Sequence, residues 1–152
     1  MSSDTNQFPS IQGKNLNKVK KIVPDDFVDR DLVVIIAFQQ WHQQLVDESI
    51  DLLTERGMDA DFNIIEVPTI GKSSKLQEIR LDGIMRFAIR SDEVRNRTIT
   101  VYLNKSELKQ SLEIENESTI YWFVVGEGTK DILIKGSGAI SEDDINEIKN
   151  LS

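Results

Sequence analysis

The chain has 152 residues, no cysteine, one histidine and a formal net charge of −8. Without a thiol it cannot form a mixed disulfide or bind a metal through thiolates, and one histidine excludes a histidine-rich metal site. Because an acidic chain repels phosphate backbones, nucleic acid is not an expected partner. The sequence indicates no cofactor and no metal.

The first residues, 1–7, are small and polar, and we expect them to be a disordered tail before one domain over residues 8–152. The longest apolar run, residues 32–38, is too short to cross a bilayer. Residues 1–7 contain no apolar signal segment. We therefore expect a cytoplasmic protein that does not insert directly into a membrane.

Residues 8–24 are expected to form a short lead-in, with turns at the breakers Pro9, Gly13 and Pro24. Residues 32–38 follow as a continuous apolar, largely β-branched run after a charged segment. Such a run is typical of a strand that is buried on both faces, as parallel sheets covered by helices require.

A helix is predicted over residues 40–56, because Val46, Ile50 and Leu53 recur at helical spacing and Gly57 follows as a left-handed cap residue. A second strand is predicted over residues 62–67, stopped by Pro68. Residues 73–88 predict a second helix that is interrupted at Asp82-Gly83.

The second half of the chain changes to a period of two. Its predicted elements are a strand at 98–103, a short helix capped by Asn104 and ending near Leu112, a hairpin of strands 119–125 and 131–135, and a last helix from Ser141. Asp144 stands three residues after Ser141, which is the spacing of a capping box.

A βαβ half followed by a ββα half is the thioredoxin arrangement. The right-handed crossover rule makes the first two long strands parallel neighbours, and the terminal hairpin adds antiparallel strands at one edge. The predicted fold class is α/β, a thioredoxin-like three-layer α/β/α sandwich with a mixed central sheet.

Particular residues carry a resemblance to known families. Phe8-Pro9, Gly13, Leu16, Leu32-Val33 and Ala37-Phe38 resemble the start of peroxiredoxin-like and thioredoxin-like domains. Glu66–Ile70, Asp82–Arg86 and Arg97-Thr98 with Tyr102 resemble cysteine-poor thioredoxin-like proteins related to the assembly factor of the mitochondrial ATP synthase. The resemblance spans residues 8–151 and implies an assembly or chaperone-like role.

The chain departs from the thioredoxins where their chemistry lies. Their catalytic cysteines stand between the first buried strand and its helix, which is here residues 38–44, and their cis-proline position is occupied by Ser118 and Thr119. We therefore expect neither thiol–disulfide exchange nor peroxidase activity.

The first candidate binding site is Gln40, Trp41, His42 and Gln43, because open α/β sheets bind ligands at the carboxyl ends of their strands. The competing interpretation is that Trp41 and His42 are packed against the lead-in. His42 shares a helical stripe with Val46 and Ile50, which favours a structural role for it.

The second candidate is Arg86 with Arg97, drawn from five arginines within residues 80–97. If they converge, they form an anion site, because a guanidinium suits carboxylate or phosphate. The alternative is ion pairing with nearby carboxylates on a solvated face. The acidic residues 113–117 and 142–144 lack the spacing of a calcium loop.

The leading functional hypothesis is a non-catalytic thioredoxin-fold module that binds a protein partner. The alternative is a cysteine-independent enzyme that uses His42 and arginines on an anionic small molecule. Homodimerisation as a structural scaffold is a third interpretation.

Overall fold

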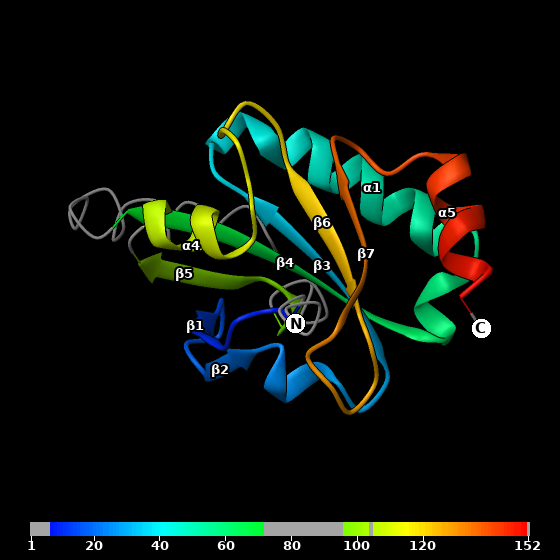
Figure 1. Ribbon diagram of the computed structural model, residues 1–152, viewed down its shortest axis with the longest axis horizontal. Helices are drawn as coiled ribbons and strands as arrows, with labels where there is room; N and C mark the ends of the chain where they lie inside the picture. The colour runs from blue at the N-terminus through cyan, green and yellow to red at the C-terminus, as the bar shows by residue number, and fades with distance from the viewer. Residues whose placement is uncertain (1–6, 72–95, 104, 152) are drawn as a thin grey trace, which may run out of the picture.

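The computed structural model describes residues 7–71, 96–103 and 105–151. These residues form a seven-stranded mixed sheet with helices on both faces (Figure 1). The strands are β1 (Ile11–Asn15), β2 (Lys20–Val23), β3 (Asp31–Ala37), β4 (Phe62–Gly71), β5 (Ile99–Leu103), β6 (Tyr121–Val125) and β7 (Ile132–Ser137). The α-helices are α1 (Gln43–Glu55), α4 (Lys105–Ser111) and α5 (Glu142–Lys149), and the short 3-10 helices are η2 (Asp25–Phe27), η3 (Gln40–His42) and η4 (Met58–Ala60).

The strand order is β2-β1-β5-β4-β3-β6-β7, so β3 lies inside the sheet. It runs parallel to β4 and antiparallel to β6. The apolar run predicted this strand correctly: residues 32–37 are all buried, because both faces of the sheet are covered.

Two hydrophobic cores lie on opposite faces of the sheet. Leu32, Val34 and Ile36 of β3 face a core shared with Phe8 and with Leu108 of α4. The alternating residues, Val33 and Ile35 among them, face a second core built with α1 and α5. Figure 1 shows α1 and α5 together and α4 away from them. The predicted three-layer α/β/α sandwich is confirmed.

The lead-in contains a strand pair, so the predicted turn at Gly13 is wrong, whereas the chain does turn at Pro24, where β2 ends and η2 begins. β1 pairs with β2 and with β5, and its burial alternates along Ile11–Asn15. Gly13 lies inside β1. A Cβ at this position would come 2.6 Å from the Thr100 carbonyl oxygen, so only glycine fits there. The glycine permits a close approach of two strands and does not break one.

Pro68 does not end the second strand, which continues to Gly71. Pro68 is in register with Ala37, the last residue of β3, and from Thr69 onward β4 pairs with β5. The missing N–H therefore falls at the end of one ladder, where its loss costs little.

The other elements follow the sequence prediction closely. Gly57 has φ 74°, and Ser141 and Asp144 form a reciprocal capping box that begins α5. β6 and β7 form the expected hairpin. The helix predicted over 73–88 and the cap at Asn104 lie outside the described residues. Within the described ranges, no helix is long and apolar enough to cross a membrane.

Candidate functional site

The site candidate lies where β3 ends and α1 begins. Phe38 and Gln39 leave the strand, η3 turns the chain, and α1 starts at Gln43. α1 has no side-chain cap and no acidic residue in its first turn, whereas α5 carries a capping box and three acidic residues. The α1 N-terminus therefore keeps its partial positive charge.

His42 holds this junction from inside. Its side chain is 0% exposed, and its Nδ1 accepts hydrogen bonds from the backbone N–H groups of Phe38 (3.1 Å) and Gln39 (3.3 Å). Burial lowers the pKa of His42; the charge of Glu117 opposes this and that of Lys105 adds to it. A neutral ring whose Nδ1 accepts must carry its proton on Nε2.

Trp41, the neighbouring residue, is on the surface, with 59% of its side chain exposed. Its ring meets the His42 ring edge-on at a centroid distance of 4.3 Å. The structure therefore divides the two residues that the sequence treated together: His42 is buried and Trp41 is presented to solvent.

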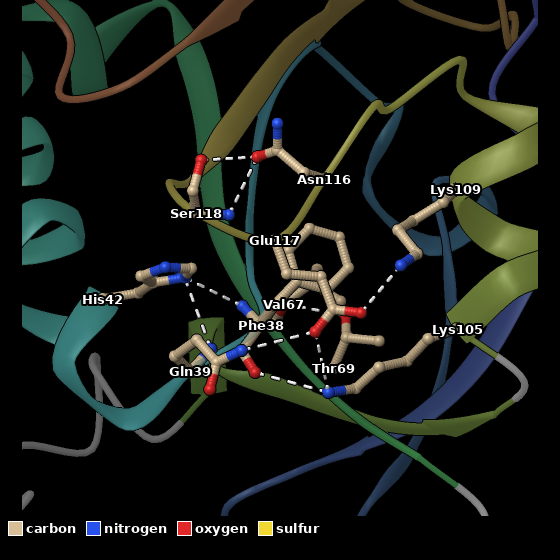
Figure 2. Close-up of polar contacts among 10 residues, drawn as sticks. All are labelled: Phe38, Gln39, His42, Val67, Thr69, Lys105, Lys109, Asn116, Glu117 and Ser118. Atoms are coloured by element: carbon tan, nitrogen blue, oxygen red, sulfur yellow. Dashed lines mark hydrogen bonds and ion pairs between the residues drawn. The ribbon is translucent and has the colours of Figure 1, made fainter.

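Glu117, just before β6, joins α4 to this junction (Figure 2). Its carboxylate contacts Lys109 Nζ at 2.8 Å, Lys105 Nζ at 3.3 Å and Gln39 Nε2 at 3.4 Å. Lys105 also donates to the Phe38 carbonyl oxygen at 3.4 Å. Burial alone would raise the pKa of Glu117, but the Lys109 hydrogen bond and the Lys105 charge outweigh it and lower that pKa.

Gln43 points to a different carboxylate, that of Glu66 in β4. Glu66 is 2% exposed and accepts from Gln43 Nε2 (3.1 Å) and Thr98 Oγ1 (3.0 Å). Burial raises the pKa of Glu66, while these two hydrogen bonds and the charge of Arg97 oppose the rise. Glu66 is therefore buried, and its two hydrogen bonds link β4 to α1 and to Thr98 inside the fold.

Arg97 lines a cleft of about 560 Å³ with residues of α1 and of the start of β4, Asp51, Glu55 and Phe62 among them, and Trp41 does not line this cleft. Its Nε is buried, and no group of the described residues accepts from it. Arg86 and the Gln40 side chain lie outside the described residues, so the convergence of Arg86 with Arg97 stays a prediction.

The sequence analysis missed Glu66 and Glu117 as organisers of the junction. Glu66 had a signal, because it is the one charged residue in the apolar segment 62–67. Glu117 had none, since its partners Lys105 and Lys109 come from another element. Within the described ranges, no cluster of three histidine or carboxylate residues has a geometry that could hold a metal ion.

No family model matches the sequence, and comparison with curated proteins finds no relative. Solved structures are similar over nearly the whole chain. The exposed lipoprotein thioredoxin Etrx1 of Streptococcus pneumoniae TIGR4 has a TM-score of 0.64 at 8% identity, covering 95% of this chain and 100% of that one. The thioredoxin domain of a thiol-disulfide oxidoreductase from Bacteroides vulgatus has a TM-score of 0.61 at 17% identity, covering 95% and 94%.

This chain has a thioredoxin-like fold. A further neighbour is BsSco, a member of the Sco family of cytochrome c oxidase assembly proteins, with a TM-score of 0.60 at 10% identity, covering 96% of this chain and 91% of that one. At these identities the likeness concerns the fold. Within it, the junction from Phe38 to Gln44 has no cysteine, so this thioredoxin-like fold is without the thiols of a redox centre.

Proposed function

We propose that the chain is a non-catalytic thioredoxin-fold module that binds a segment of a partner protein at the β3–α1 junction. One observation carries the proposal: Trp41 is 59% exposed at the carboxyl end of β3. An exposed indole offers a large apolar contact area, and tryptophan is enriched among the residues that dominate binding energy in interfaces.

The rest of the junction suits such a role because hydrogen bonds and an ion pair hold it in place. His42 fixes the Phe38–Gln39 backbone, and Glu117 ties Gln39 to the lysines of α4. A preorganised surface binds with less loss of conformational entropy than a mobile one. The absence of cysteine removes the thiol chemistry and leaves recognition as the use of this position.

The partner class follows from the resemblance and from one neighbour. The sequence resembles cysteine-poor proteins related to the assembly factor of the mitochondrial ATP synthase, and BsSco belongs to a family of cytochrome c oxidase assembly proteins. We propose an assembly or chaperone-like role on this basis. Among the described residues, Arg97 lines the cleft beside α1 and β4, and no hydrogen bond links it to His42. No observation therefore specifically favours the enzymatic alternative.

Site-specific photocrosslinking in cells of the source organism tests the proposal. A benzophenone amino acid replaces Trp41 in one variant and Leu151 in the control, because Leu151 is a comparably exposed apolar residue, 42% exposed, just beyond α5. The expected result is a defined protein adduct from position 41 and none from position 151. Equal adduct patterns from both positions would exclude the junction as the binding surface.

A further inference from the structure

The inference concerns a hydrogen-bond donor inside the junction and deepens the proposed function, on which it rests. His42 Nε2 is buried, and no group of the described residues accepts a hydrogen bond from it. Its Nδ1 is occupied by the two backbone N–H groups, so Nε2 is the protonated nitrogen. A buried donor without an acceptor costs free energy that native structures rarely leave uncompensated.

The surroundings of this donor favour a negatively charged acceptor. His42 is the N-cap residue of α1, which has no side-chain cap and no acid in its first turn, and the N-terminus of a helix attracts anions. Lys105 and Lys109 together carry one more charge than Glu117 neutralises. Both Glu117 and Lys105 are close enough for their charges to act on His42, and the carboxylate of Glu117 is itself paired with the two lysines.

Trp41 lies between the solvent and the His42 ring that it contacts. Its ring lies against the His42 ring, and yet most of it is exposed. Trp41 is thus a surface side chain in direct ring contact with the buried imidazole. Trp41 and His42 can therefore act on the same ligand, the indole on its apolar part and the imidazole on its acceptor.

We propose that the His42 Nε2–H donates to a carboxylate of an acidic peptide segment, while Trp41 moves aside and packs on that segment. The carboxylate belongs to an aspartate or glutamate side chain, or to a chain terminus. Binding would give the unsatisfied Nε2–H donor a charged acceptor. This hydrogen bond should raise the affinity for the peptide about tenfold or more.

The single histidine makes the test direct. In ¹⁵N-labelled protein the imidazole nitrogens give one set of signals, and the free protein is expected to show the Nε2–H tautomer. Three peptides are then added separately: acetyl-Gly-Asp-Gly-amide, acetyl-Gly-Gly-Gly with a free carboxylate, and the neutral acetyl-Gly-Asn-Gly-amide. The Nε2–H proton is expected to move downfield with one or both carboxylates, which identifies the source, and not with the neutral peptide.

His42→Asn is the matched variant. The asparagine side-chain oxygen can still accept from the Phe38 and Gln39 amides, and the shorter side chain places its NH2 donors short of the position that Nε2 occupies. The variant should melt like the parent and bind the acidic peptide about tenfold or more weakly. An Nδ1–H tautomer, an Nε2–H signal indifferent to carboxylate, or parent-like binding by folded His42→Asn would each overturn the inference.

The outcomes separate the two proposals. A protein adduct at position 41 that persists in His42→Asn would support the proposed binding module and contradict the His42–carboxylate hydrogen bond. Carboxylate binding by the isolated protein, without any adduct at position 41, would support the hydrogen bond and contradict the binding module. An equal shift caused by sodium acetate and sodium chloride would show a nonspecific ion effect and count against the inference.

Discussion

Replacing Trp41 by alanine should cost little stability, in contrast to the same change at Trp122. About two-fifths of Trp41 is buried, since 59% is exposed; for a tryptophan that is roughly 100 Å². At about 25 cal/mol per Å² this gives an upper bound of about 2.5 kcal/mol. Trp122 is 1% exposed, and removing a fully buried tryptophan costs about 3–5 kcal/mol.

Urea denaturation followed by far-ultraviolet circular dichroism measures both variants, because this signal does not depend on the tryptophans. Trp41→Ala should lower the free energy of unfolding by less than about 2.5 kcal/mol, and Trp122→Ala by clearly more. The Phe variants supply a second readout, since the chain has only two tryptophans. Trp122→Phe should leave a red-shifted emission that iodide quenches, and Trp41→Phe a blue-shifted emission that iodide does not reach. Equal stability losses for the two alanine variants, or a blue-shifted and protected Trp41, would refute the assignment of Trp41 to the surface.

Three further outcomes are expected. Purified protein should neither reduce insulin nor consume peroxide, because it has no thiol; activity that co-purifies with the chain would contradict this. Because the folded-state pKa of Glu66 is raised by burial, its contribution to stability is fully present below the unfolded pKa, about 4.3, and is lost as pH rises through the folded value. Glu66→Gln should therefore gain stability relative to the parent as pH increases from about 4 in urea melts, whereas parallel pH profiles would exclude the effect. Gly136→Ala should destabilise the fold by about 1–3 kcal/mol or more, because the added Cβ would meet the Trp122 indole at 2.1 Å. The control Gly128→Ala has open space around the new Cβ but a φ of 68°, and it should cost about 1 kcal/mol. A larger loss of stability at Gly128 than at Gly136 would contradict the predicted clash.

The elements that the sequence predicted well are those whose local pattern and tertiary environment agree. β3 is apolar throughout because both its faces are covered, and α1 shows a helical stripe because only one of its faces is. The predictions failed where a residue has two physical meanings. From the sequence, Gly13 and Pro68 were both predicted to interrupt the regular structure. In the fold, Gly13 allows the close approach of the Thr100 backbone, and Pro68 stands where the pairing of β4 with β3 ends.

The position of the candidate site could be predicted from the sequence, but not all of the residues that form it. The carboxyl end of a buried strand is a general binding position, and Trp41 and His42 stand there. The helical stripe that His42 shares with Val46 and Ile50 correctly favoured a structural role for His42, whereas the exposure of Trp41 depends on the turn of η3 and was not predicted. Glu117 reaches the junction from the segment before β6, a contact that only the folded chain creates.

The position of β3 also bears on how the chain is made. Leu32 pairs with Val125, 93 residues further along the chain. At a synthesis rate of about 5–20 residues per second, the ribosome needs roughly 5–20 s after β3 to synthesise β6, its antiparallel neighbour. During that interval the segment Leu32–Ile36, all aliphatic, presents unpaired backbone. A chaperone that binds this segment of the nascent chain would therefore protect it for as long as β6 has not been synthesised.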